Sequence, residues 1–370
     1  MRRLPRHRRA EGAPAESGRR ITPVTGRSHG ERDAQPHGYD AVLYVSFGGP
    51  EGPDDVVPFL KNVTRGRGVP QRRLHDVAEH YLRFGGVSPI NSENRKVIDA
   101  LEGELAQRGP ALPVYWGNRN WHPLLTDTMA QMQSDGVKRA IAFVTSAWSS
   151  YSGCRQYRED ISRARSAVGE LAPVVDKIRQ FFNHPGFVEA QADKVRVALD
   201  TFSEDARAGA HLVFTAHSIP TNMAAASSYV EQLSEACRLV AERLGGDNRW
   251  SLGYQSRSGP PHIAWLEPDV SEYLEKLATE GVGDVILVPI GFLCDHIEVR
   301  FDLDVEAASV AQKRGLNMVR AETVGTHPAY IAMIRDLIVE RTEGRPERPA
   351  LGSMGASHDI CAADCCRIAG

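Results

Sequence analysis

Residues 284–304 read DVILVPIGFLCDHIEVRFDLD and contain the pattern that decides the fold. An apolar run ends at Ile290, and the polar residues Asp295, His296 and Glu298 follow it. Because the run does not alternate with polar residues, it predicts a strand buried on both faces, as in a parallel sheet. Polar side chains just after such a strand stand at its carboxyl end, where open α/β sheets bind ligands.

The same pattern recurs along the chain. Further apolar runs predict strands at residues 41–47, 113–117, 139–145, 211–216, 250–255 and 317–319. Helices are predicted between them, at residues 54–62, 71–81, 92–107, 124–135, 155–167, 184–203, 228–244, 267–279, 297–314 and 328–342. Alternating strands and helices predict parallel sheets with helices on both faces. We therefore expect an α/β protein of two Rossmann-like domains, residues 39–175 and 176–342, with a ligand cleft between them and a tail at residues 343–370.

The composition excludes several classes of protein. With 370 residues, of which 42% are hydrophobic and 25% charged, the chain is neither a long disordered protein nor a disulfide miniprotein. No run of about eighteen apolar residues predicts a membrane span. The formal net charge of -3 gives no whole-chain reason to expect nucleic-acid binding.

The charge is unevenly distributed. Residues 1–38 hold nine arginines and four acidic residues, a formal +5, which leaves -8 for the rest. This segment is rich in Arg, Pro, Gly and Ser, so we expect a disordered basic extension. A transit peptide or a tether to an anionic surface is one interpretation, and a dispensable extension is the other.

His217 is the strongest single candidate in the second half. Residues 211–220 read HLVFTAHSIP, so the imidazole follows a buried strand directly and Pro220 ends the pattern. An imidazole at such a strand end suits a general base or a metal ligand. A lone histidine is more often structural, so this pattern alone leaves both interpretations open.

Glu298, Asp302 and Glu306 form the second candidate site. Their spacing of four residues places three carboxylates along one helix face. Like charges at this spacing repel, so the row costs stability unless a cation binds. A solvated surface helix is the alternative, although such helices usually interleave Lys or Arg.

The first half offers weaker signals. Residues 46–56, SFGGPEGPDDV, form a turn from strand to helix that lacks the G-x-G-x-x-G dinucleotide pattern. Arg65 and Arg67 can bind carboxylates or stand as solvated loop residues. Trp148 and Tyr157 can stack on a flat ligand or belong to the core.

Together these motifs resemble those of the ferrochelatases, which insert iron into a porphyrin. The matching segments, in family order, are residues 46–70, 80–91, 144–160, 215–220 and 288–304. They lie between about residues 39 and 341, and TAHSIP with GFLCDHIEVRFDLD is the most specific pair. The resemblance implies a lyase with two Rossmann-like domains around a porphyrin cleft, in agreement with the fold expected above.

The resemblance also implies roles for individual residues. His217 and Glu298 correspond to the catalytic pair that binds Fe²⁺. Asp302 and Glu306 continue the row of carboxylates from Glu298 and correspond to a path along which the cation reaches the pair. The positions that correspond to porphyrin contacts are Ser88, Tyr157, Arg65, Arg67 and Phe47. Some bacterial members have a tyrosine at the position of Phe47, and its oxygen approaches the iron. Phe47 has no oxygen, so this chain has no axial oxygen ligand at that position. The face from which the metal enters stays undecided.

The cysteines are clustered at the end of the chain. Cys361, Cys365 and Cys366 lie close together in sequence, and adjacent cysteines rarely form a disulfide with each other. With Cys154 they make four thiols, the number that a [2Fe–2S] cluster needs. Some ferrochelatases resemble this arrangement, with one internal and three C-terminal ligands. Zinc and an unligated tail are the alternatives, and we expect Cys237 and Cys294 to be packing residues.

We expect Fe²⁺ insertion into coproporphyrin III, the porphyrin with four carboxylates. No long apolar insertion follows residue 91, and arginine outnumbers lysine by 37 to 7, as in GC-rich bacterial genomes. Both points favour coproporphyrin III and a cytoplasmic enzyme. The resemblance to coproporphyrin enzymes implies a soluble monomer without a membrane span. The alternatives are a protoporphyrin IX ferrochelatase, a cobalt or nickel chelatase, and a non-enzymatic haem or iron–sulfur binding protein.

Overall fold

The computed structural model describes residues 38–367 apart from positions 67, 246–247 and 261. They belong to a unit that runs from Pro36 to Gly370. Apart from Gly38, the basic extension predicted at residues 1–38 lies outside the described residues, and so does Arg67. None of the helices in the described ranges combines the length and apolar character that crossing a membrane requires.

The first half forms a four-stranded sheet in which every neighbouring pair is parallel, with the order β2-β1-β3-β4. Its strands are β1 (Ala41–Ser46), β2 (Val114–Asn118), β3 (Arg139–Val144) and β4 (Val174–Lys177). Its helices are α1 (Pro53–Val63), α2 (Gln71–Leu82), α3 (Ile90–Arg108), α4 (Leu125–Ser134), the π-helix η1 (Tyr151–Arg155) and α5 (Gln156–Val168).

The second half repeats this plan, with the order β6-β5-β7-β8 and all pairs parallel. Its strands are β5 (His211–His217), β6 (Trp250–Gln255), β7 (Asp284–Val288) and β8 (Asn317–Arg320). Its helices are α6 (Pro185–Leu199), α7 (Glu204–Gly209), α8 (Thr221–Ala225), α9 (Tyr229–Leu244), α10 (Val270–Thr279), the π-helix η2 (Val299–Ala307), α11 (Ala308–Arg314) and α12 (Pro328–Thr342).

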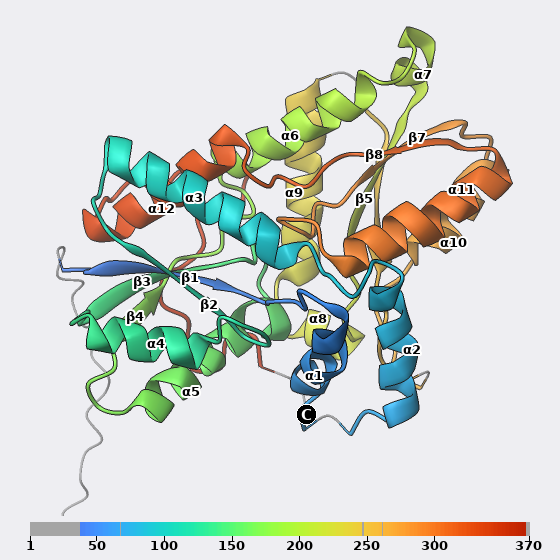
Figure 1. Cartoon of the computed structure of the whole chain (residues 1–370). Helices are drawn as coiled ribbons and strands as arrows, with labels where there is room; N and C mark the ends of the chain where they lie inside the picture. Colours follow the sequence, from blue (N-terminus) through green and yellow to red (C-terminus); the bar gives the residue numbers. More distant parts are fainter. Residues whose placement is uncertain (1–37, 67, 246–247, 261, 368–370) are drawn as a thin grey trace, which may run out of the picture. The chain divides into compact units, whose positions relative to one another are not determined.

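Both faces of each sheet are buried, which confirms the interpretation of the unbroken apolar runs. In β1, Val42 and Tyr44 pack with α3 and α12, whereas Leu43 and Val45 pack with α4 and α5 on the other face (Figure 1). The second sheet is covered in the same way, by α6 and α9 on one face and by α10, η2 and α11 on the other. The predicted fold class is therefore confirmed.

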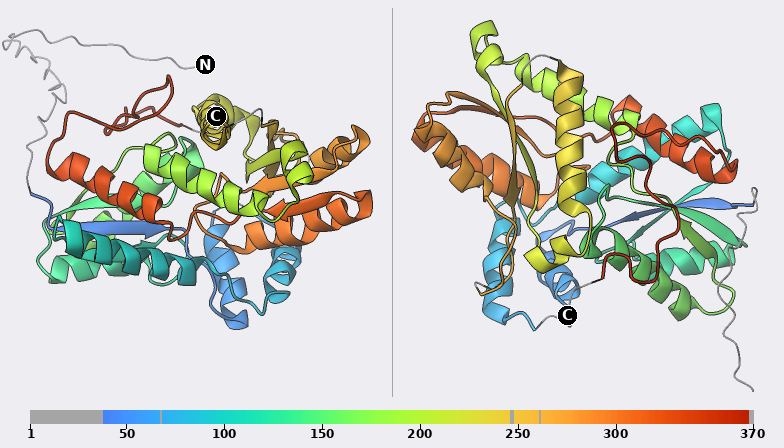
Figure 2. Two further views of the ribbon diagram at one scale, coloured as in Figure 1. Left: turned by 90° about the horizontal axis from the view of Figure 1, so that it is seen from above. Right: turned by 180° about the vertical axis from the view of Figure 1, so that it is seen from behind.

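The two halves share one continuous core. The largest cluster of buried side chains contains residues of both sheets, and α12 packs against α6 and also against α3. The indole Nε1 of Trp148 donates to the carbonyl of Gly291, 3.2 Å away, and so joins the loop after β3 to the loop after β7. Arg179, which follows β4 of the first sheet, forms a buried pair with Glu340 of α12, with two hydrogen bonds of 2.8 Å. The residues that follow α12 continue as an irregular dark-red trace (Figure 2).

Some predicted elements were wrong in detail. The sequence analysis missed β4, because this short, partly exposed strand at the edge of the sheet lacks an unbroken apolar run. The helix predicted at residues 184–203 ends at Leu199, and α7 follows it. The helix predicted at residues 297–314 has a π-helical first part, residues Val299–Ala307, and periodicity did not reveal this. The short helix α8 was also missed.

Candidate active site

His217 is the last residue of β5, where the strand leaves the sheet. Its ring Nδ1 is hydrogen-bonded to the carbonyl oxygen of Ser218. A carbonyl only accepts, so in the neutral ring this contact assigns the proton to Nδ1 and leaves a free lone pair on Nε2. The hydroxyl of Tyr229 donates to the carbonyl of His217 at 2.9 Å and holds the backbone in place.

Glu298 faces the free nitrogen of His217. It immediately precedes η2, and its Oε2 lies 3.7 Å from Nε2 of His217. Both side chains are partly exposed, with relative accessibilities of 33% for His217 and 46% for Glu298, so solutes can reach them. The two residues that were singled out independently from the sequence therefore meet at the carboxyl ends of β5 and β7, the edge where α/β sheets bind ligands.

Asp302 extends the acidic side of this site. Burial, reinforced by the charges of Glu298 and Glu306, raises the pKa of Asp302 to about 7. The Ser256 hydroxyl and the Gln255 amide donate to its carboxylate, and these bonds oppose part of that shift. Ser256 has a φ of 63°, an unusual conformation for a residue other than glycine, and it presents its hydroxyl to Asp302.

Glu306 lies at the exposed end of the acidic row. Burial and the charge of Asp269 raise its pKa, whereas Arg83 acts in the opposite direction. Asp302 is close enough to both Glu298 and Glu306 for their charges to contribute to its raised pKa. The acidic row is built on a π-helix, a distortion that often occurs at functional sites.

Helix α2 of the first half lies against this row. The ring of His80 stacks on Phe301 of η2, with centroids 3.9 Å apart and planes 13° from parallel. Burial, followed by the charges of Glu298 and Asp302, raises the pKa of Tyr81. The site therefore contains side chains from both halves of the chain. The sequence analysis did not predict that residues of α2 lie beside the acidic row.

Phe47 belongs to an aromatic cluster next to α1 and α2. Its ring contacts Phe59 edge to face, with centroids 6.2 Å apart, and Phe59 contacts Tyr81 at 5.8 Å. Trp121 completes the cluster. The charges of Glu298 and Asp302 contribute to the raised pKa of Tyr81, so Tyr81 lies near these carboxylates. The cluster therefore supplies an apolar wall close to the acidic row.

The predicted porphyrin contacts of the first half are in different environments. Ser88 is buried and its amide donates to the carbonyl of Pro50 at 2.8 Å. Arg65 is exposed and donates to the side chain of Asn62 at 2.6 Å. Tyr157 is 5% exposed, within the core of the first sheet, and the Arg119 guanidinium lies 4.3 Å above its ring. Among the described residues, none of these three side chains forms a hydrogen bond, ion pair or ring contact with His217 or Glu298.

The four predicted cluster cysteines come together although Cys154 is far from the others in sequence. All four are free thiols. Cys154, in η1, shares a hydrogen bond with Cys361, and the Cys365 and Cys366 sulfurs are 3.6 Å apart. Arg155 fixes the tail beside Cys154, because its Nη1 donates to the carbonyls of Ala363 and Cys365, each at 3.0 Å. As predicted, Cys237 and Cys294 are buried packing residues.

His358 is a neighbour of these thiols that the sequence analysis missed. Its Nε2 lies 4.0 Å from the Cys365 sulfur, and the donor atoms of His358, Cys361 and Cys365 are all within 4.8 Å of one another. The hydrogen bond from Cys154, above all, lowers the pKa of Cys361, and the charges of Lys177 and Arg158 act in the same direction. A histidine three residues before the first cysteine of the tail was the available signal.

A family model described as Ferrochelatase matches residues 39–342. The chain is 53% identical over 356 residues to the coproporphyrin III ferrochelatase of Streptomyces griseus, with 90% of this chain and 94% of the relative covered. It is also 53% identical over 329 residues to a ferrochelatase of Rhodopirellula baltica, with 89% and 93% covered.

Among solved structures, SirB from Bacillus subtilis with Fe³⁺ is similar in fold. The TM-score is 0.51 at 13% sequence identity, and the match covers 82% of this chain and 95% of SirB. This likeness concerns the fold alone. It agrees with the two parallel sheets flanked by helices described above.

Proposed function

The chain belongs to the ferrochelatase family, and from that premise we propose that it inserts Fe²⁺ into coproporphyrin III to form coprohaem. The observation that carries the proposal is the pairing of His217 with Glu298 at the sheet edge, at the head of an acidic row. Identity of 51–53% to coproporphyrin III ferrochelatases of two Streptomyces species supports the choice of porphyrin.

The chemistry follows from charge balance. A free-base porphyrin loses two pyrrole N–H protons as a divalent metal enters, so the site has to accept protons and supply the cation. We assign proton acceptance to Nε2 of His217, since its Nδ1 is held by the Ser218 carbonyl. The tautomer is thereby fixed before the substrate arrives.

The acidic row serves the metal and the protons. Carboxylate oxygens and one imidazole bind Fe²⁺ without the strong preference that thiolates would impose, so the ion can be passed on. Asp302 exchanges protons near neutrality, because its pKa is raised to about 7. In this proposal Glu298 receives the ion beside His217, and Asp302 and Glu306 form its path from the exposed end of the row.

The porphyrin contacts proposed from the resemblance belong to the same hypothesis. Phe47 and its aromatic neighbours supply an apolar surface, and Ser88, Arg65, Arg67 and Tyr157 remain candidates for the macrocycle and its carboxylates. The division into domains at residues 39–175 and 176–342, with the tail at 343–370, and a monomeric state in the cytoplasm are part of this proposal as well.

We also propose that Cys154, Cys361, Cys365 and Cys366 hold a [2Fe–2S] cluster. The donor set fits, since four free thiols meet at one place and Arg155 ties the tail to the helix that carries Cys154. Such a cluster would supply one-electron chemistry. The four cysteines would hold it, and no step of the metal insertion proposed above depends on it.

Steady-state metallation assays test the proposed activity. The purified chain would be supplied with Fe²⁺ under anaerobic conditions and with either coproporphyrin III or protoporphyrin IX, and loss of free-base porphyrin fluorescence would be followed. We expect a clearly higher kcat/KM for coproporphyrin III. A preference for protoporphyrin IX would reverse the choice of substrate, and faster insertion of Co²⁺ or Ni²⁺ would contradict the choice of metal.

A further inference from the structure

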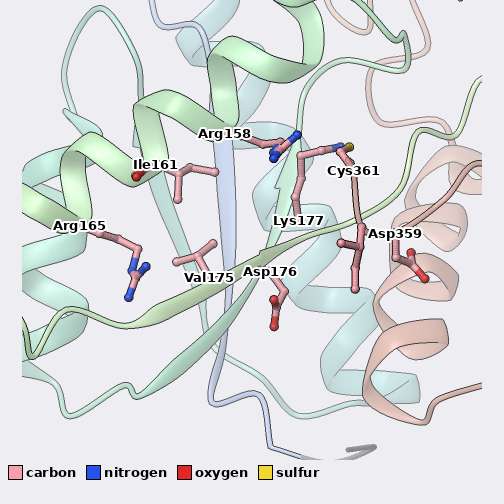
Figure 3. A pocket seen from close by; sticks show the side chains of 10 residues that line it. Arg158, Ile161, Arg165, Val175, Asp176, Lys177, Asp359 and Cys361 are labelled. Atoms are coloured by element: carbon pink, nitrogen blue, oxygen red, sulfur yellow. The ribbon is translucent and has the colours of Figure 1, made fainter. Parts of the chain in front are cut away.

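A pocket opens beside the cysteines of the tail. It has a volume of about 230 Å³ and is lined by side chains of α5, β4 and the tail, among them Arg158, Lys177, Asp359 and Cys361. Figure 3 shows the guanidinium of Arg158 and the sulfur end of Cys361 at the same side of this pocket, with Lys177 next to them. A proposed cluster ligand and two cations therefore share one solvent-facing space.

The other charged groups of the pocket already have partners. The Lys177 ammonium donates to the Gln180 side chain at 2.6 Å and to the carbonyl of Ile178 at 2.7 Å. Asp176 pairs with Arg139 at 2.7 Å, and Asp359 pairs with Arg348 at 2.9 Å. Arg165, the fourth of these groups, donates from Nε to the carbonyl of Pro173 at 2.6 Å. These contacts hold the four groups in place.

Arg158 differs from them. Within the described part of the chain it forms no hydrogen bond and no ion pair. It is half-buried on α5, close to the turn of the chain that carries Cys154. Burying an arginine without an anionic partner is unfavourable, so its position points to a negative charge that occupies the neighbouring space.

The proposed cluster supplies that charge. Thiolates and sulfide outweigh the ferric charges in a cysteine-ligated [2Fe–2S] cluster, and reduction adds one more negative charge. Fixed positive charge beside the sulfurs therefore stabilises the reduced state more than the oxidised state. Net charge and polar contacts around the sulfurs are among the factors that set the potential of such clusters.

This inference rests on the cluster proposed above. We propose that the positive charge of Arg158 balances the negative charge of the cluster and raises the reduction potential of the cluster, although Arg158 is not a ligand. Arg158 acts on the cluster through its charge alone. Arg158 stands at the rim of the pocket on the side of Cys361, and Lys177 contributes a second, hydrogen-bonded charge. The residues around the thiols are then suited to a redox-active centre that solvent-borne electron donors can reach.

Spectroelectrochemical titration of the anaerobically purified full chain tests this assignment. The electrode supplies one electron to each cluster, and no proton or ligand is released. We expect Arg158→Gln to keep its iron and acid-labile sulfide and to show a more negative potential than the unaltered chain. Arg158→Lys should recover most of the shift, since it restores the charge.

Arg163→Gln is the matched control. Arg163 lies on the same helix, is exposed and pairs with Asp160, and it does not line the pocket. Its replacement removes the same charge and should leave the potential unchanged, which would support a local effect of Arg158.

Three results would overturn the assignment. The first is an unchanged potential in Arg158→Gln at full cluster content, and the second is an equal shift in Arg163→Gln. Loss of iron and sulfide from Arg158→Gln is the third, because it would make Arg158 necessary for assembly. Absence of iron and sulfide from the unaltered chain would instead refute the cluster itself, and with it this inference, while leaving the metallation assay unaffected.

Discussion

The Nε2 atom of His217 lies 3.7 Å from Oε2 of Glu298. The first residue ends β5 and the second precedes η2, so packing of two neighbouring parallel strands creates the pair. With Nδ1 of His217 bound to the Ser218 carbonyl, the nitrogen that faces Glu298 is the basic one. Several experimental expectations depend on this arrangement.

Replacing His217 with alanine should reduce kcat for iron insertion by about 10²–10⁴-fold, the usual contribution of a positioned proton acceptor. Porphyrin binding, followed by fluorescence quenching, should persist because the aromatic cluster is untouched. His262→Ala removes an exposed histidine and should keep full activity. Retained turnover in His217→Ala would contradict the proposed proton acceptor.

Asp302 should make stability depend on pH. Its folded-state pKa of about 7 exceeds the ordinary value of 3.8, so ionisation opposes folding. The free energy of unfolding should therefore fall as the pH rises from about 4 to 7. Above pH 7, Asp302 should cause little further change in it. The loss has an upper bound of about 4 kcal/mol.

Urea unfolding of Asp302→Asn at pH 5 and pH 8 measures this effect. The free energy of unfolding of the variant, minus that of the unaltered chain, should be larger at pH 8 than at pH 5. Asp99→Asn, an exposed position on α3, is the control and should show no such difference. An identical pH dependence in Asp302→Asn and the unaltered chain would refute the raised pKa.

Gly291→Ala should disturb the active site by displacing the backbone next to His217. A Cβ at this position would come within 2.6 Å of the Cα of Ala216, the residue before His217, so backbone has to move. We expect a loss of about 1–3 kcal/mol in stability, typical of overpacking, together with lower kcat. Gly283→Ala is a suitable control, because a Cβ there has no neighbour within 4 Å and its φ is not in the left-handed range. Equal behaviour of the two variants would show that the contact with Ala216 tolerates a methyl group.

Cys154→Ser should abolish the visible absorption that a [2Fe–2S] cluster gives and lower the iron and sulfide content, as should Cys365→Ser. Cys237→Ala is the control, since this thiol is buried in the core of the second half and has no cluster neighbour among the described residues. Full absorption in Cys154→Ser would exclude it as a ligand. Zinc without iron in the unaltered chain would favour the alternative metal.

The sequence by itself determined the fold class and the principal candidate residues. Unbroken apolar runs identify strands buried on both faces, because only helices on both sides of a sheet make such burial favourable. Polar residues just past those runs, such as His217 and Glu298, were identified for the same reason: strand ends are where such sheets bind ligands. These signals are local, so a single sequence carries them.

Only the tertiary structure decided which residues meet. Edge strand β4 has no unbroken apolar run, and the π-helix η2 has no periodic signature in the sequence. Tyr81 approaches the acidic row, Cys154 reaches the tail, and Arg158 lies beside Cys361 only because packing brings distant segments together. Periodicity reports how each segment is buried, whereas distances between side chains depend on how the two sheets and the tail pack.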